Sequence, residues 1–161
     1  MAKAAKAVPE GYHTITPSLT LDNAAQAIDW YKKALGAEEV SRSVGPDGKI
    51  MHAELKIGNS RFMMNDVMPG SKGPQAFGGS PASLWLYVEN SDTLFNRAVG
   101  AGAKVQMPIA DQFWGDRAGA VADPAGYTWW IATRKEDFTP AEMQQRAAEF
   151  FKQQMAHGAP R

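Results

Sequence analysis

SLTLDNAAQAIDWYKKALGAEEV, residues 18–40, decides the fold, because residues 83–105, SLWLYVENSDTLFNRAVGAGAKV, repeat its pattern. In each copy an alternating, strand-like segment leads into an acidic residue and an Asn, then a helical segment, a glycine and a second strand-like segment. Leu21 and Val88 are 67 positions apart, whereas the glycines that follow the two helical segments are 66 apart, so one single-residue gap aligns the copies. A repeat of this length predicts a duplicated supersecondary unit, and two such units commonly build one site between them.

Each copy runs on into further strand-like segments, so both units are predicted to be βαβββ. In the first strand, residues 14–21, period two puts Ile15, Leu19 and Leu21 on the face that the helix covers and the hydroxyl side chains on the other. The predicted fold class is α+β: two βαβββ units form a curved, cup-shaped mixed sheet with the helices outside, followed by a C-terminal helix. The predicted boundaries are a flexible arm at 1–11, a domain at 12–134 with units at 12–67 and 82–134, and a C-terminal helix and tail at 135–161.

The C-terminal helix has a clear start signal. Residues 139–142, TPAE, have the capping-box form with proline at the first helical position. An apolar stripe follows, made of Met143, Ala147, Phe150, Phe151 and Met155. The stripe fits packing against the same domain or contact with another molecule, so this helix is also a candidate protein-interaction module.

The composition limits the classes of partner. With 161 residues and 44% hydrophobic content, the chain is expected to fold as a globular domain. A net charge of zero gives no basic field for nucleic acid or an anionic membrane, and the absence of cysteine excludes zinc–thiolate sites. No phosphate-binding glycine loop is present, so no nucleotide cofactor is expected. Since the N-terminal segment does not resemble a signal peptide, a cytoplasmic location is expected.

Three features of the chain carry a family resemblance: the two βαβββ units, the run SLTLDNAAQAIDWYKKALGAE and the turn DPAGYTWW. With these features the chain resembles the vicinal oxygen chelate superfamily of glyoxalases, extradiol dioxygenases and bleomycin-resistance proteins. The resemblance covers about residues 12–134. Within it, MHAELKIGNSRFMMND and DQFWGDRAGAVADPAGYTWW are similar to a glyoxalase-like subgroup that includes phosphonate-operon accessory proteins. The resemblance implies a cup built by both units, and a homodimer.

In the metal-dependent members of the superfamily, the metal ligands come from the first and last strands of each unit. Carried over to this chain, those positions fall on Thr16 and Ser83 in the first strands and on Met64 and Trp130 in the last strands. None of these side chains is an imidazole, carboxylate or thiolate, which divalent metals prefer. We therefore expect no inherited metal centre and no cofactor.

His52 and Glu54 are the candidate catalytic residues. On a strand they share one face with Lys56, which by the repeat is the face of the cup, while Ala53 and Leu55 take the other. A general base or a ligand anchor is one interpretation, because imidazole titrates near neutrality and a carboxylate can orient it. A polar ladder on a solvated sheet is the other. A metal shifted to this pair would lack an evident third protein ligand.

The remaining candidates are polar and aromatic side chains expected to line the cup. Trp114 and Arg117, in the segment FWGDR, offer a flat apolar surface beside a guanidinium, which suits a planar or anionic ligand; the alternative is a packed loop with an internal ion pair. Aromatic groups with a few hydroxyls are typical of small-molecule pockets, although they can also fill a closed core. The predicted ligand-binding residues are Thr16, Ser18, Phe62, Met64, Ser83, Trp85, Tyr87, Trp114, Arg117 and Trp130.

Three functions are consistent with these features. The first is a metal-free protein, similar to bleomycin-resistance proteins, that binds a small organic molecule in the cup. The second is a glyoxalase-like lyase or isomerase that uses His52 or a shifted metal site. The third is a protein-interaction module that acts through the C-terminal helix.

Overall fold

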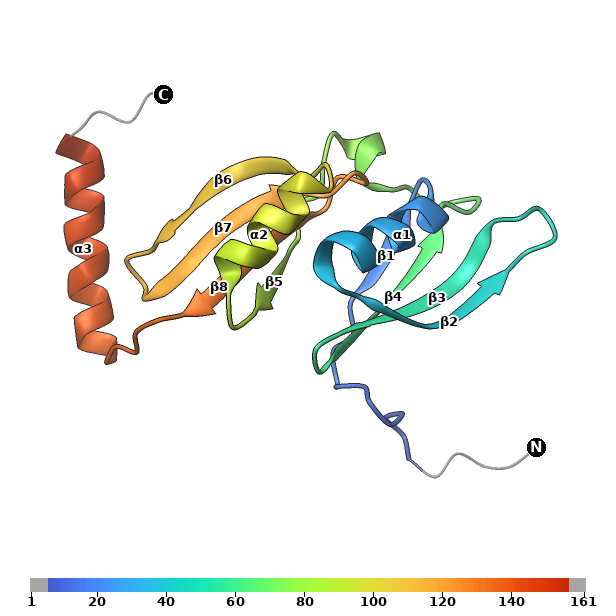
Figure 1. The fold of residues 1–161 in the computed structure, drawn as a ribbon, viewed down its shortest axis with the longest axis horizontal. Helices are drawn as coiled ribbons and strands as arrows, with labels where there is room; N and C mark the ends of the chain where they lie inside the picture. The colour runs from blue at the N-terminus through green and yellow to red at the C-terminus, as the bar shows by residue number, and fades with distance from the viewer. Residues whose placement is uncertain (1–5, 157–161) are drawn as a thin grey trace.

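A computed structural model describes residues 6–156 of the chain. The beginning of the predicted N-terminal arm, residues 1–5, and the end of the predicted tail, residues 157–161, lie outside the described residues. The described residues form two four-stranded sheets with helices α1 and α2 on the near side in Figure 1, and a third helix, α3, that stands apart at the left. No described helix has the length and apolar character needed to cross a bilayer.

The two sheets have the same topology. Sheet 1 has the strand order β1-β4-β3-β2, and sheet 2 has the order β5-β8-β7-β6. The pairs β1–β4 and β5–β8 are parallel, and the other pairs are antiparallel. The predicted α+β fold with two βαβββ units is therefore confirmed. The strands are β1 (Ser18–Leu21), β2 (Glu38–Val44), β3 (Ile50–Ile57), β4 (Ser60–Asp66), β5 (Ser83–Tyr87), β6 (Lys104–Asp111), β7 (Asp116–Ala122) and β8 (Thr128–Arg134). The helices are α1 (Ala24–Leu35), the 3-10 helix η1 (Pro74–Phe77), α2 (Ser91–Gly100) and α3 (Pro140–Ala156).

The two main helices begin in the same way. The side chain of Asn23 accepts a hydrogen bond from the Gln26 N–H at 3.1 Å, and the side chain of Asn90 accepts one from the Thr93 N–H at 2.9 Å. Asn is a favourable N-cap residue because its side-chain oxygen satisfies one of the free N–H groups of the first turn. Helix α1 ends at Gly36, whose φ of 69° lies in the left-handed region.

The last strand of each unit also caps the helix of that unit. Asp66 Oδ1 accepts from the Ala24 N–H at 2.7 Å, and Thr133 Oγ1 accepts from the Ser91 N–H at 2.8 Å. Both partners in the second bond lie 67 positions after their counterparts in the first. The spacing between the copies is therefore 67 both at the helix start and at the end of the last strand, although it is 66 at the glycines in between.

Helices α1 and α2 contact each other reciprocally. Trp30 Nε1 donates to the Ala101 carbonyl oxygen at 2.9 Å, and Arg97 Nε donates to the Lys33 carbonyl oxygen at 2.6 Å. Trp30 and Arg97 are again 67 positions apart. Each helix thus supplies a donor to the free carbonyl groups at the end of the other, which ties the units together through an approximate two-fold relation.

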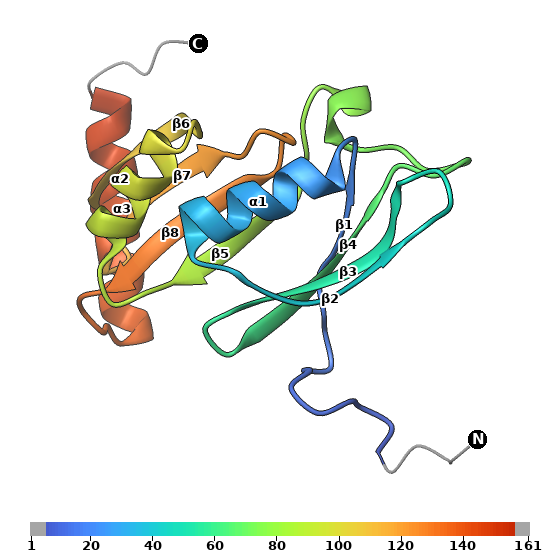
Figure 2. The ribbon, with the colours of Figure 1, turned by 45° about the vertical axis from the view of Figure 1, so that its right-hand side comes forward.

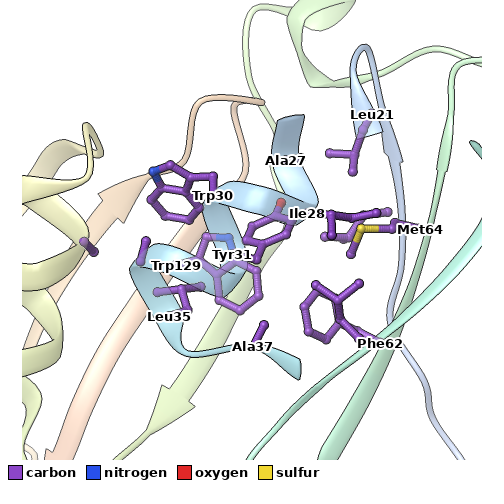
Figure 3. Close-up of a cluster of buried hydrophobic side chains, with 14 of the residues drawn as sticks. Leu21, Ala27, Ile28, Trp30, Tyr31, Leu35, Ala37, Phe62, Met64 and Trp129 are labelled. Atoms are coloured by element: carbon purple, nitrogen blue, oxygen red, sulfur yellow. The ribbon is translucent and has the colours of Figure 1, made fainter. Parts of the chain in front are cut away.

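Helix α1, which belongs to the first unit, lies between the two sheets, as Figure 2 shows. Tyr31 is at the centre of the core, with its ring centroid 5.8 Å from that of Phe62 in sheet 1 and 5.5 Å from that of Trp129 in sheet 2 (Figure 3). The Tyr31 hydroxyl donates to Asp123 Oδ2 at 2.6 Å, and Asp123 also accepts from Trp129 Nε1 at 2.9 Å. The turn DPAGY therefore anchors the second unit to the first helix.

The first strand is shorter than predicted. It begins at Ser18, because Pro17 has no N–H to give to the ladder and ends the regular pairing. Ile15 is 86% exposed, so its predicted place on the buried face is wrong. Thr16 lies before the strand and its hydroxyl donates to the His13 carbonyl oxygen at 3.4 Å, so the prediction that Thr16 occupies a first-strand position is also wrong.

The prediction that Met64 lines the cup is wrong as well, whereas Phe62, which is 4% exposed, does reach the groove between the two units. Met64 is 0% exposed and, with Phe62, points toward helix α1 in Figure 3. In the ladders, Met63 pairs with Ser18 in the first unit, and Trp130 pairs with Trp85 in the second. Met63 rather than Met64 is therefore the counterpart of Trp130, and a shift of one residue moves a side chain to the opposite face of a strand.

Candidate functional site

A groove of about 570 Å³ lies between the two units, and we call it the inter-unit groove. One wall is strand β5, and the other consists of the N-terminal segment and the turn between β3 and β4. This turn brings Arg61 to the groove, while Phe62 and Trp129, both nearly buried, reach its floor. The lining residues are His13, Ile15, Pro17, Ile57, Gly58, Asn59, Ser60, Arg61, Phe62, Ser83, Leu84, Trp85, Leu86, Tyr87, Val88 and Trp129.

Four aromatic side chains stand together on the side of sheet 2 that faces away from α2: Trp85, Tyr87, Trp114 and Trp130, which we call the aromatic wall. Trp85 and Trp130 stack with centroids 4.8 Å apart and planes 2° apart. Trp114 meets both edge-on, with centroids 6.2 Å from Trp85 and 6.4 Å from Trp130. Trp85 lies on the edge strand β5, is 43% exposed and lines the groove, so part of its surface remains open there.

A buried carboxylate holds the aromatic wall in place. Asp116 is 1% exposed and accepts hydrogen bonds from the Tyr87 hydroxyl at 3.0 Å, Trp114 Nε1 at 2.9 Å and Arg134 at 2.9 Å. Burial, and then the Asp116 carboxylate, raise the pKa of the Tyr87 hydroxyl, which keeps it protonated as a donor. The aromatic wall is thus preorganised, since two of its four rings are bound to one fixed group.

His52 and Glu54 lie on the face of sheet 1 that α1 does not cover. Ala53 and Leu55, which alternate with them along β3, are fully buried on the opposite face, against the core. His52 Nε2 is 3.3 Å from Glu54 Oε1, and Glu54 Oε2 accepts from Arg61 Nη1 at 3.5 Å. Neither residue lines the inter-unit groove directly. Arg61 connects the pair to the groove.

Tyr12 completes this polar cluster. The Arg61 guanidinium carbon lies 5.1 Å from the centroid of the Tyr12 ring. The Tyr12 hydroxyl, followed by His52 and Arg61, lowers the pKa of Glu54. The Tyr12 hydroxyl is itself buried. Glu54 is therefore kept ionised next to the imidazole.

Arg117 lies away from the aromatic wall, contrary to its predicted place beside Trp114. Its guanidinium forms two 2.6 Å hydrogen bonds to the Asp92 carboxylate of α2 and one of 3.2 Å to Asp111. These bonds raise the pKa of Arg117 further above its usual range. Since Asp116 and Arg117 are consecutive on β7, they point to opposite faces of the sheet. The alternative of an ion pair between these two residues is therefore wrong too, because Arg117 pairs with Asp92 and Asp111 while Asp116 pairs with Arg134.

The four positions that the resemblance implies for metal ligands carry no imidazole, carboxylate or thiolate: Thr16, Met64, Ser83 and Trp130. The pairs that the ladders place opposite each other in the first and last strands, Ser18 with Met63 and Trp85 with Trp130, carry none either. Among residues 6–156, no group of three or more His, Cys, Asp or Glu side chains is arranged to hold a metal ion. We therefore derive no chemistry through a metal.

Sequence reasoning placed Ser83, Trp85 and Tyr87 on one face from their alternation, and the structure brings all three to the groove. It missed Arg61, Tyr12 and Asp116. Arg61 and Asp116 carry no local pattern that separates them from surface charges, and only the fold brings them to their partners. The open hydroxyl face predicted for β1 is reduced to Ser18 and Thr20, because the strand starts late.

The topology defines a protein of two paired βαβββ units with a groove between them. Residues 12–131 match the family model of the Glyoxalase/Bleomycin resistance protein/Dioxygenase superfamily, and the chain belongs to this superfamily. The match covers both units, and it supports the resemblance stated from the sequence.

Three proteins illustrate the relationship. Over 135 residues, 81% of this chain and 89% of the relative, the chain is 43% identical to the uncharacterized protein Mb0911c of Mycobacterium bovis. The crystal structure of protein PA1353 from Pseudomonas aeruginosa has a TM-score of 0.64 and 28% identity, and covers 77% of this chain and 99% of its own. A PhnB protein from Bacillus cereus, described as a putative 3-demethylubiquinone-9 3-methyltransferase, shares the fold at a TM-score of 0.59 and 21% identity, over 75% of this chain and 99% of its own.

Proposed function

We propose that the protein binds a small planar organic molecule in the inter-unit groove, stacked on the open face of Trp85. The observation that carries this proposal is the aromatic wall, in which Trp130 backs Trp85 and Asp116 fixes Tyr87 and Trp114. A large, rigid aromatic surface that is left partly exposed beside a groove costs stability in water and favours a ligand that covers it. Among the described residues that line the groove, Arg61 is the one arginine or lysine, and it is placed to select a ligand with an acidic group.

Binding without the family's metal centre is part of the same proposal. The donor set at the inherited positions supports it, since hydroxyl, thioether and indole groups bind divalent metals weakly or not at all. Specificity would then come from stacking and from hydrogen bonds to Ser83 and Ser60, which line the groove. The cytoplasmic location and the lack of nucleic-acid and membrane partners remain predictions from the composition.

A homodimer also remains a proposal. No strand of one sheet pairs with a strand of the other among the described residues, and β1 and β5 are both edge strands. A second copy of the chain could pair with such an edge and bring the His52–Glu54 face opposite an aromatic wall. Light scattering across a concentration series would measure the oligomeric state directly, and a monomer at all concentrations would contradict the dimer.

The binding proposal predicts saturable quenching of tryptophan fluorescence by planar probes. We expect proflavine, a planar cation, and anthraquinone-2-sulfonate, a planar anion, both to bind, because stacking on indole tolerates many rings. Arg61 should favour the anion. Titrations before and after treatment with EDTA should give the same Kd. A Kd that rises at least tenfold after chelation would contradict metal-free binding, and the absence of saturable quenching by either probe would contradict the site.

A glyoxalase-like lyase or isomerase is the second candidate, favoured by the ionised Glu54 beside His52 at 3.3 Å. If His52 is a general base, His52→Ala should lower turnover of hemithioacetals of 2-oxoaldehydes by about 100-fold or more. Lys56→Ala, on the same strand face, is the matched control and should keep most of the activity. Measuring the metal content of the same samples distinguishes catalysis by His52 as a general base from catalysis by a metal bound at a shifted site. Equal rates in the wild type and His52→Ala would exclude His52 as the base.

A further inference from the structure

We infer that helix α3 positions the aromatic wall, and that it acts through Phe113 and Trp114 in the turn between β6 and β7. The inference deepens the proposed function and rests on it in one respect, namely that the aromatic wall binds the ligand. Helix α3 lies outside the duplicated units, at one end of the molecule in Figure 1. Its contacts nevertheless lead to the stacked indoles on sheet 2.

A continuous series of ring contacts connects the helix to the wall. The Phe150 ring of α3 stacks on Phe113, with centroids 4.8 Å apart and planes 29° apart. Phe113 meets Trp114 edge-on at 5.1 Å. Trp114 in turn packs edge-on against Trp130 and against Trp85, the ring on which the ligand is proposed to stack, so a displacement of Phe113 is transmitted to that ring.

Hydrogen bonds fix the backbone of the same turn. Arg146 of α3 donates through Nε to the Phe113 carbonyl oxygen at 2.7 Å, and Arg134 donates to the Trp114 carbonyl oxygen at 3.0 Å. Gly115 has a φ of 95°, in the left-handed region, and a Cβ there would collide with the Glu136 carbonyl oxygen. The turn is thus enclosed between α3 and the segment that leads to it, which leaves Trp114 little freedom to rotate.

The contacts of α3 are concentrated at this turn. None of its residues is buried, and Met155 on the apolar stripe is 85% exposed. Arg146 also lies over the Phe138 ring, with the guanidinium carbon 4.3 Å from the centroid, which fixes the start of the helix beside the turn. A helix with so little buried surface contributes little to global stability, so a change in α3 can alter the wall without unfolding the domain.

A double-mutant cycle tests this inference, with Phe150→Ala, Trp114→Phe and the combined variant. We expect Phe150→Ala to change the near-ultraviolet circular dichroism of the tryptophans and to weaken proflavine binding by about 3- to 10-fold, the range of one lost aromatic contact. In the Trp114→Phe background, Phe150→Ala should add almost nothing, because the route through Trp114 is already removed. Met155→Ala, on the exposed part of the same helix, is the control and should change neither quantity.

Two results would overturn the inference. One is additive effects of the two substitutions, which would mean that Phe150 acts independently of Trp114. The other is an unchanged tryptophan spectrum and affinity in Phe150→Ala with its far-ultraviolet spectrum and Tm retained. The spectroscopic cycle needs no ligand, so it decides the positioning role even if the wild type binds neither probe, and that latter result would count against the proposed function alone.

Discussion

Replacing Asp123 by alanine is expected to lower the free energy of unfolding by about 3–5 kcal/mol, because it leaves several buried donors without an acceptor at once. The carboxylate is 5% exposed and accepts four hydrogen bonds, from the Tyr31 hydroxyl, Trp129 Nε1 and the N–H groups of Ala125 and Tyr127, at 2.6 to 2.9 Å. The Tyr31 bond joins the two units. Urea unfolding followed by circular dichroism measures the loss.

Asp47→Ala is the matched control for this experiment. Asp47 accepts one hydrogen bond, from the Lys49 N–H at 3.1 Å, in the exposed turn between β2 and β3. Water can replace that bond, so the control should cost about 1 kcal/mol or less. If Asp123→Ala were no more destabilising than Asp47→Ala, the DPAGY turn would not be the connection between the units that the structure indicates.

The Tyr31–Asp123 bond also has a consequence at high pH. Burial, and then the charge of Asp123, raise the pKa of the Tyr31 hydroxyl well above its usual value. The unfolded chain ionises this tyrosine above about pH 10, while the folded protein still holds the proton, so stability is full below that pH and falls as the pH rises further. Tyr31→Phe should therefore show a shallower loss of stability between about pH 10 and 11 than the wild type.

Much of the fold follows from the sequence because the repeat was visible at the helices. Asn23 and Asn90 mark helix starts by their chemistry, and a strict alternation such as Ser83-Leu84-Trp85-Leu86-Tyr87 leaves one assignment of faces. The same reasoning placed His52 and Glu54 together on the face away from the core. Patterns of this kind are local: they placed the side chains of β5 correctly but failed for Ile15, which precedes the start of β1.

Strand β4 shows where this reasoning fails. Phe62, Met63 and Met64 are consecutive apolar residues, so the alternation does not say which of them faces the helix. The single-residue gap in the repeat was taken to apply to this strand, whereas the gap falls elsewhere and the spacing at β4 and β8 is 67. Only the ladder, which sets Met63 opposite Ser18, resolves the register.

The partners within the site were beyond prediction for a different reason. Asp116 accepts a hydrogen bond from Tyr87, which lies 29 positions earlier in the sequence. Phe113 stacks on Phe150, which belongs to the C-terminal helix α3. No periodicity links such residues, since their contact depends on how the β6–β7 turn folds back on the sheet. The sequence therefore indicated the aromatic content of the site but not the carboxylate that arranges it.

The largest effect on binding is expected from Trp85→Ala, which should weaken the affinity for proflavine by about 10- to 100-fold, or about 1.4–2.8 kcal/mol. Trp85 offers the open face on which a planar ring can stack, and its loss also exposes Trp130 without its partner. Fluorescence titration measures the change. Trp85→Phe should recover part of the affinity, because a smaller aromatic ring restores some of the stacking surface.

Phe77→Ala is the control that separates stacking in the groove from general aromatic adsorption. Phe77 is also an exposed aromatic side chain, but it lies on η1, away from the inter-unit groove. Its replacement should leave the proflavine Kd unchanged. Equal weakening by Trp85→Ala and Phe77→Ala would show that the probe binds exposed rings without selection, whereas loss in Trp85→Ala alone would locate the binding surface on the aromatic wall, where Asp116 holds the supporting rings in place.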